Sequence, residues 1–290
     1  EEINETLDKD SADLVCAFYN VTVAGNFEGQ NILHQSQSLE TFAAAQGRDL
    51  AECKQQLDRA RQTLFAERQQ RIYPGLDDKI LADWNGLLID ALARAGAVLG
   101  MPRYLEAARR ASDMIDTKMR DTAGRLMHSW REGVAEGMAF VDDYAALLGA
   151  WITLYECTFE EAWIERARGL AETLQQRYED PRQGGFFFTA DDHERLIVRR
   201  KELFDQATPN GNALAAEGLL RLADLLGRDD FRQSAQRAIE VAGDTIRQAP
   251  LAQGQSVLAL MRQVTAVRQW VMVGSEPSPE TKEVMHGLRQ

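Results

Sequence analysis

The chain has 290 residues, of which 44% are hydrophobic and 27% are charged, and its net charge is −12 at pH 7. This composition predicts a soluble globular protein, and the acidic surplus argues against nucleic-acid and anionic-membrane partners, which require clustered Lys and Arg. No apolar run is long enough to span a bilayer, and we expect no secretory signal peptide at the start.

The cysteines and histidines indicate a reducing compartment and no structural metal. Cys16, Cys53 and Cys157 are far apart and form no CxxC motif, so we expect free thiols and a cytoplasmic protein. The four histidines show no spacing typical of metal ligands. We therefore expect no metal site and no cofactor.

The first third of the chain predicts helices separated by a segment rich in Gly and Asn. We expect a short helix over residues 1–19, a loop or short strand over 21–33 and a weak second helix over 38–46. Residues 49–70 predict a strong amphipathic helix, because their apolar side chains recur at spacings of three and four residues. The dipeptide Pro74-Gly75 then interrupts the chain.

A repeated pair of helices fills most of the remaining sequence. A mostly apolar helix is followed by a tight turn and by a second helix, which starts with an aromatic residue and has Ala four residues later. We place the repeats near 78–120, 141–180 and 210–248, and we expect one helical domain over 1–267.

The two helices of each pair differ in their polarity. The first helix is apolar on nearly all sides, which indicates an inner layer, whereas the amphipathic second helix indicates an outer layer. Small residues such as Gly86 and Gly149 are expected to let inner helices approach closely. Gly100 and Gly227 suit the left-handed position that ends a helix. The pattern predicts an all-α fold, either an array of α-hairpins or a toroid.

Two segments depart from this helical pattern. The stretch from Gly184 to Asp205 contains FFFT and RLIVRRK, which we interpret as two short strands of a β-hairpin inserted across DDHE. Residues 268–290 predict a small β-α tail that begins with a β-like run over 269–274. We expect both segments to be additions to a helical body.

Polar and aromatic residues gather where each inner helix begins. They lie in the stretches DDKILADWNGLL, VDDYAALL and DQATPNGNALAA. If the three helices run in the same direction, these stretches meet at one end of the array. The candidate site residues are Asp78, Trp84, Asn85, Asp142, Tyr144, Asp205, Asn210 and Asn212.

Acids, amides and aromatic rings together are typical of a carbohydrate site, because acids and amides bind hydroxyls and rings pack on the apolar faces of sugars. Glycoside hydrolysis needs two carboxylates, for which we select Asp78 and Asp142, whereas His128 would serve an epimerase-like proton transfer. A structural interpretation stays open as well. Asp78, Asp142 and Asn210 can cap helices, and Trp84 can be a core residue.

Seven stretches carry a family resemblance: Arg68–Leu87, Val141–Tyr144, Gly184–Thr189, Lys201-Glu202, Pro209–Asn212, Gly25–Gly29 and Asn31–Leu33. In this order and spacing they resemble the YyaL-like family, which includes the spermatogenesis-associated thioredoxin-like proteins. The resemblance covers nearly the whole chain, and its most specific part is the DDK and WNG stretch.

The resemblance implies a partial (α/α)6 toroid, similar to the six-hairpin glycosidases and the N-acylglucosamine 2-epimerases. It matches the C-terminal half of the family's proteins, so we expect their thioredoxin-like domain to be absent here. Half a toroid leaves inner helices without neighbours, and a second copy or another chain would complete it. Two functions stay open: a carbohydrate-binding or carbohydrate-active segment, glycosidase- or epimerase-like, with a sugar ligand, and a non-catalytic interaction scaffold.

Overall fold

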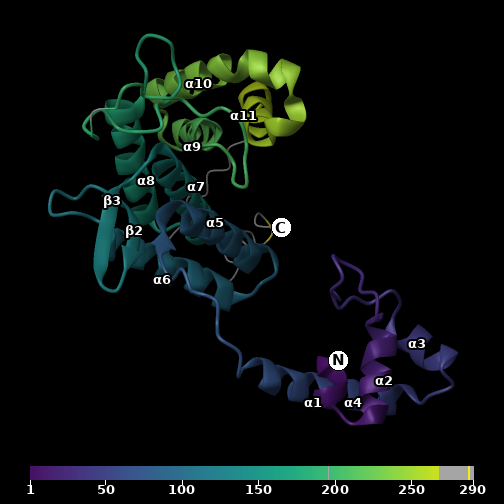
Figure 1. The fold of residues 1–290 in the computed structure, drawn as a ribbon. Helices are drawn as coiled ribbons and strands as arrows, with labels where there is room; N and C mark the ends of the chain where they lie inside the picture. The colour runs from purple at the N-terminus through teal and green to yellow at the C-terminus, as the bar shows by residue number, and fades with distance from the viewer. Residues whose placement is uncertain (195, 268–286, 288–290) are drawn as a thin grey trace, which may run out of the picture. The chain divides into compact units, whose positions relative to one another are not determined.

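The computed structural model describes residues 1–194, 196–267 and 287, and the chain forms two compact units (Figure 1). Unit 1 is Glu1–Asp77 and unit 2 is Asp78–Gln290. This division differs from the single domain expected over 1–267. The buried apolar side chains form two separate clusters, one in each unit, and residues 71–79 join neither because they are exposed. The predicted β-α tail falls on residues outside the described part of the chain.

Unit 1 is a small helical unit whose helices begin at capping side chains. Its helices are α1 (Glu2–Thr6), α2 (Lys9–Phe18), α3 (Leu39–Ala45) and α4 (Leu50–Arg68). Asp8, Ser38 and Asp49 accept backbone N–H groups at the starts of α2, α3 and α4, which fixes where these helices begin. Their apolar faces pack into one cluster that includes Phe18 and Leu57.

The helices predicted over 38–46 and 49–70 are confirmed as α3 and α4. The helix expected over 1–19 is divided into α1 and α2 instead. Leu7 adopts an extended conformation (φ −109°, ψ 156°), and Asp8 then caps a new helix. The segment over 21–33 is a loop with an isolated β-bridge between Phe27 and Gln30.

Unit 2 is an array of helical hairpins, as the repeats predict (Figure 1). The first helices are α5 (Ala82–Val98), α7 (Val141–Thr158) and α9 (Gly211–Leu226), and the second helices are α6 (Pro102–Lys118), α8 (Glu161–Thr173) and α10 (Asp229–Gln248). Helix α5 packs against α7 and α7 against α9, whereas each second helix packs mainly against its own partner. The predicted inner and outer layers are therefore confirmed.

Shorter elements complete the array. A π-helical turn (Leu174–Tyr178) extends α8, and a 3-10 turn (Pro250–Ala252) leads into α11 (Gly254–Val264). Helix α11 packs on α9 and α10. It continues the inner layer past the third hairpin.

Small residues allow the inner helices to approach closely. A Cβ at Gly86 of α5 would lie 2.9 Å from the Ala146 carbonyl carbon of α7, so the expected close approach is confirmed there. Gly149 does not act in this way, because its Cβ position faces open space. Gly100 and Gly227 have positive φ at the ends of α5 and α9, as predicted. Although the inner helices are apolar, none of the described helices has the length and hydropathy needed to cross a bilayer.

The β-structure lies in a different place from the predicted hairpin. A three-stranded antiparallel sheet forms from β1 (Ile80–Leu81), β2 (Met127–Arg131) and β3 (Val134–Met138). Arg131 pairs with Val134 across a two-residue turn, in which Glu132 and Gly133 both have positive φ. Such a turn matches the twist of the two strands.

The prediction of strands at FFFT and RLIVRRK is wrong for the residues that the structure describes. There, Phe186 makes only an isolated bridge with Glu179. Phe186 is also held by a side chain, because Asn212 accepts its N–H (2.6 Å) and donates to its carbonyl oxygen (2.9 Å). One backbone hydrogen bond, from the Phe188 N–H to the Arg200 carbonyl oxygen (2.8 Å), joins the two segments, but their described residues form no strands.

Candidate functional site

The three inner-helix entrances of unit 2 meet, as the sequence predicts. The backbone N–H of Asp83, on α5, donates to Oδ1 of Asp143 on α7 (3.0 Å). Oδ1 of Asp142, also on α7, occupies the space beside Gly211 of α9, only 2.0 Å from where a Cβ would lie. We call Asp83, His128, Asp142, Asp143 and Gly211 the entrance cluster.

Asp143 is the fixed centre of this cluster. Its side chain is fully buried, and it accepts the backbone N–H groups of Phe140 (2.7 Å) and Asp83. The Nδ1 atom of His128, on β2, lies 3.0 Å from both carboxylate oxygens. The hydrogen bond and the charge of Asp143 raise the pKa of His128, which favours its protonated form.

Asp142 has the opposite surroundings, although it is the adjacent residue. Its Oδ1 atom is buried and receives no hydrogen bond from the described residues. Burial, together with the nearby charges of Asp143 and Glu202, raises the pKa of Asp142 from 3.8 to about 7. A carboxyl group that keeps its proton near neutral pH can donate it in catalysis.

Asp78 does not share this environment. It lies before β1, its side chain is 44% exposed, and it forms an ion pair with Nε of Arg131 on β2 (2.6 Å). The structure therefore shows Asp78 in an ion pair with β2, and its expected pairing with Asp142 stays a prediction. Asp83 and Glu202 are acids that act on Asp142 instead.

Two of the predicted ligand-binding residues, Asn85 and Tyr144, make contacts within the protein. The amide of Asn85 donates to the Leu81 carbonyl oxygen (2.8 Å). Tyr144 is buried against Tyr178, with ring centroids 5.3 Å apart, so it packs in the core, and its expected substrate contact stays a prediction. Trp84, by contrast, is 60% exposed at the start of α5, where a ring can stack on a ligand.

The three polar residues around the start of α9 hold the fold together. Asn210 caps the helix by accepting the Ala213 N–H (2.8 Å), which confirms its structural interpretation. Asp205 accepts the Asn210 amide (2.8 Å) and the backbone N–H of Gln255 (3.0 Å), and so joins α9 to α11. Asn212 is buried and bonds Phe186. All three side chains are thus engaged within the protein, and their expected role as ligands stays a prediction.

A metal ion fits this cluster poorly. Asp83, His128 and Asp143 each offer one ligand atom, and these atoms lie within 4.8 Å of one another. The oxygens of Asp143, however, already accept two backbone N–H groups and face the His128 ring nitrogen. A bound cation would have to break these hydrogen bonds.

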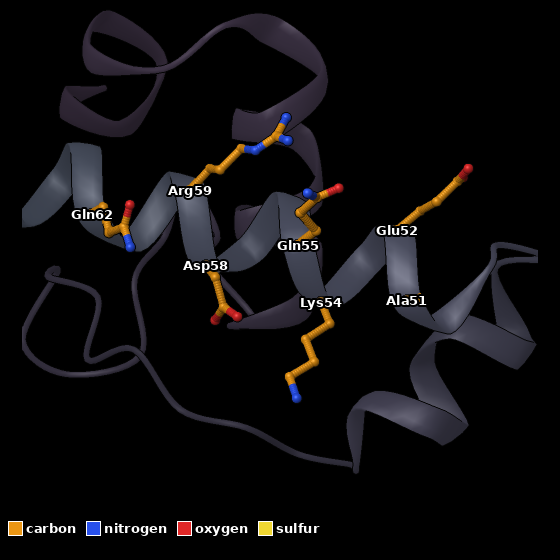
Figure 2. Close-up of a pocket in the computed structure, with 7 residues that line it drawn as sticks. All are labelled: Ala51, Glu52, Lys54, Gln55, Asp58, Arg59 and Gln62. Carbon is orange, nitrogen blue, oxygen red and sulfur yellow. The ribbon is translucent and has the colours of Figure 1, made fainter.

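Two hollows of the described surface lie elsewhere. The larger, of about 620 Å³, is lined by seven residues of α4 in unit 1 (Figure 2). In Figure 2, Lys54 and Asp58 point to one side of the helix and Arg59 to the other, so no walls converge on a ligand. The second, of about 400 Å³, lies at the end of α11 around Met261 and Arg262. Neither includes a residue of the entrance cluster.

The sequence predicted which helix ends meet, but it did not predict the contact between Asp143 and His128 at the centre of the cluster. Asp143 looks like one of two equivalent acids in VDDY, and His128 lies outside the helices and strands that the sequence predicts. The position of Asp143 as the third residue of α7 was the available signal, because a carboxylate there can accept the N–H before the helix. No sequence pattern shows that β2 carries His128 to it.

The hairpin array and its gathered helix entrances define the class of this chain, which is an (α/α)6 toroid fold. The unsaturated glucuronyl hydrolase specific for heparin has a similar structure, with a TM-score of 0.50, 14% sequence identity, and an alignment covering 78% of this chain and 71% of that one. At this identity the likeness shows the fold alone.

The relatives by sequence are spermatogenesis-associated proteins. The chain is 32% identical to human spermatogenesis-associated protein 20 over 295 residues, which cover 95% of this chain and 38% of that protein. The mouse protein of the same name is 31% identical, over 90% of this chain and 34% of that protein. The chain thus spans little more than a third of the length of these curated relatives. No known family profile matches it.

Proposed function

We propose that this chain is the C-terminal toroid portion of a YyaL-like, spermatogenesis-associated thioredoxin-like protein. The identity with human spermatogenesis-associated protein 20 supports this, since it extends over 95% of the chain. The order of the motifs from Arg68 to Asn212 supports it as well.

We further propose that unit 2 is a carbohydrate-active toroid whose site lies at the entrance cluster. One observation carries this proposal. Asp142 holds a carboxyl oxygen that is buried without a hydrogen-bond partner among the described residues, at the meeting point of three helix N-termini, with a pKa of about 7. Trp84 offers an exposed ring at the start of α5, next to Asp83 of the cluster.

The chemistry is that of a general acid. The protonated carboxyl of Asp142 donates its proton to the oxygen of the bond that breaks, and a base in the cluster takes a proton from the incoming water. The neighbour of similar fold is named a glucuronyl hydrolase, which makes carbohydrate the first ligand class to test, although a shared fold does not fix a reaction.

The test is a thermal-shift panel of neutral, acidic and amino sugars, as monosaccharides and disaccharides. We expect at least one sugar to raise the melting temperature of the wild-type protein. Asp142→Asn should reduce that stabilisation or abolish turnover, because the proton donor is gone. Asp78→Asn, which changes an acid in a surface ion pair, is the matched control and should behave like the wild type. A panel without any stabilising sugar would remove the proposal.

A second candidate is a non-catalytic interaction scaffold. It is favoured by apolar side chains that remain exposed on the two outermost inner-layer helices. On α5 these are Trp84, Leu88 and Val98, and on α11 they are Leu258, Met261 and Val264. A second copy or another chain would cover them. Sedimentation across a wide concentration range should then show association, and a monomer at all concentrations would argue against self-association.

A further inference from the structure

We propose that His128 is the base of the entrance cluster, acting through Nε2, and that Asp143 is the residue that positions it. This inference rests on the proposed function and names the group that activates water at the same site. The inference depends on the hydrogen bonds and ion pairs that each potential base near the site already makes.

The carboxylates of the cluster are poorly suited to accept the proton. Asp83 uses Oδ1 to accept the backbone N–H of Trp84 (2.8 Å). Asp143 is fully buried and surrounded by three N–H groups. Glu202, which lies outside the cluster but close enough to act on Asp142, forms an ion pair with Arg200 (2.7 Å). Each of these carboxylates is therefore already engaged by donors of the protein itself.

His128 has the geometry of an oriented base. Its Nδ1 atom faces both oxygens of Asp143, which fixes the tautomer that carries the proton on Nδ1. Nε2 receives no hydrogen bond from the described residues, and the side chain is 29% exposed. The remaining lone pair is thus on a nitrogen that a water molecule can approach.

The ring is also held from its side. Phe140 meets the imidazole edge-to-face, with centroids 5.1 Å apart, and Phe140 itself stacks on Phe188 at 4.6 Å. The Asp143 carboxylate that faces Nδ1 also accepts two backbone N–H groups, those of Phe140 and Asp83.

The proton balance closes with Asp142. Water attacks the anomeric carbon as the bond to the leaving oxygen breaks. The water proton moves to Nε2 of His128, and the carboxyl proton of Asp142 moves to the leaving oxygen. Exchange with solvent then returns a proton to Asp142 and removes one from His128. The charges that face His128 are Asp143 and Asp142 of α7 and Asp83 of α5, and all of them favour its protonated form.

The first arm of the test observes the histidine directly. Long-range ¹H–¹⁵N spectra of the whole chain should show the Nδ1–H tautomer of His128 above its pKa. Asp143→Asn should lose this preference and lower the pKa of His128 by about one unit or more, since the facing charge is removed. An unchanged tautomer and pKa would overturn the positioning role of Asp143.

The second arm measures turnover of the sugar that stabilises the wild type in the panel. His128→Gln should slow turnover by about tenfold or more while sugar binding stays within about threefold, and His34→Gln in unit 1 is the control. Asp143→Asn should also move the low-pH limb of the rate profile to lower pH, because this limb reports the pKa of the base. Full turnover by His128→Gln overturns this inference and leaves the carbohydrate proposal standing. If no sugar binds the wild type, both proposals fall.

Discussion

At the scale of single residues, two adjacent acids of α7 receive opposite environments from the fold. Asp143 points to backbone N–H groups and a histidine, whereas Asp142 points to a buried position beside Gly211, where its Oδ1 makes no well-formed hydrogen bond with the described residues. The residue types alone cannot separate the two. The difference arises because consecutive residues of a helix project about 100° apart.

This difference predicts a pH dependence of stability. The folded-state pKa of Asp142 is raised to about 7, so its contribution to stability is full below pH 4 and is lost as pH rises through 7. Relative to Asp142→Asn, the wild type should lose roughly 2 kcal/mol of unfolding free energy between pH 4 and pH 8, after allowance for solvent screening. Urea unfolding at several pH values measures this. A difference that does not change with pH would contradict the buried environment of Asp142.

Gly211 is the residue that makes room for Asp142. A Cβ there would lie 2.0 Å from Asp142 Oδ1 and 2.9 Å from Val141 Cγ1. Gly211→Ala should therefore cost about 1–3 kcal/mol of stability. Gly149→Ala is the matched control within an inner helix, where a Cβ meets open space, and it should be neutral or stabilising by roughly 0.5–1 kcal/mol. Equal effects of the two substitutions on stability would contradict the claim that Gly211 makes room for Asp142 at the α7–α9 contact.

At the scale of elements, a polar clamp holds the inner helices in register. Thr153 of α7 is buried, and its hydroxyl accepts hydrogen bonds from Arg94 of α5 (3.1 Å) and Arg221 of α9 (2.7 Å). The same hydroxyl donates to Asp90, and Arg221 also pairs with Glu156. The clamp thus joins three inner helices below their entrances.

Removal of this one hydroxyl should loosen the inner layer. Thr153→Val keeps the shape of the side chain but leaves the two guanidinium groups short of an acceptor, so we expect a loss of about 1–3 kcal/mol. Thr173→Val in α8 removes a hydroxyl that bonds only its own helix, to the Gly169 carbonyl oxygen, and serves as the control. Chemical denaturation of both variants gives the comparison, and equal stabilities would argue against the clamp.

The sequence predicted these elements well where periodicity carries the information and poorly where it does not. The apolar and amphipathic patterns identified the inner and outer helices. The β2–β3 hairpin was missed because Glu132-Gly133 is not one of the common turn pairs, and near Phe186 the backbone bonds the Asn212 side chain instead of forming a strand.

Within the site, the acids and amides were identified, but their partners depend on contacts between distant segments. Asp205 and Asn210, for example, look like ligand groups until their bonds to Gln255 and Ala213 are known.

At the scale of the whole molecule, the two units have separate cores, and the exposed segment over 71–79 lies where they divide. Each unit should therefore resist proteolysis better than this segment does. Limited trypsin digestion of the full chain should first cut between Arg71 and Lys79 and leave a protected fragment of unit 2. First cuts inside α5, α7 or α9 would contradict the division, and mass spectrometry of the earliest fragments distinguishes the outcomes.

The central claim is that a sugar binds where α5, α7 and α9 begin. Tryptophan indole resonances report on this directly, because Trp84 is 60% exposed at the entrance of α5, whereas Trp151 and Trp163 are 0% and 4% exposed in the array. Titration with the stabilising sugar should shift the indole signal of Trp84 and leave those of Trp151 and Trp163 in place. A saturating sugar that leaves Trp84 unmoved, or that shifts only the buried indoles, would contradict the account.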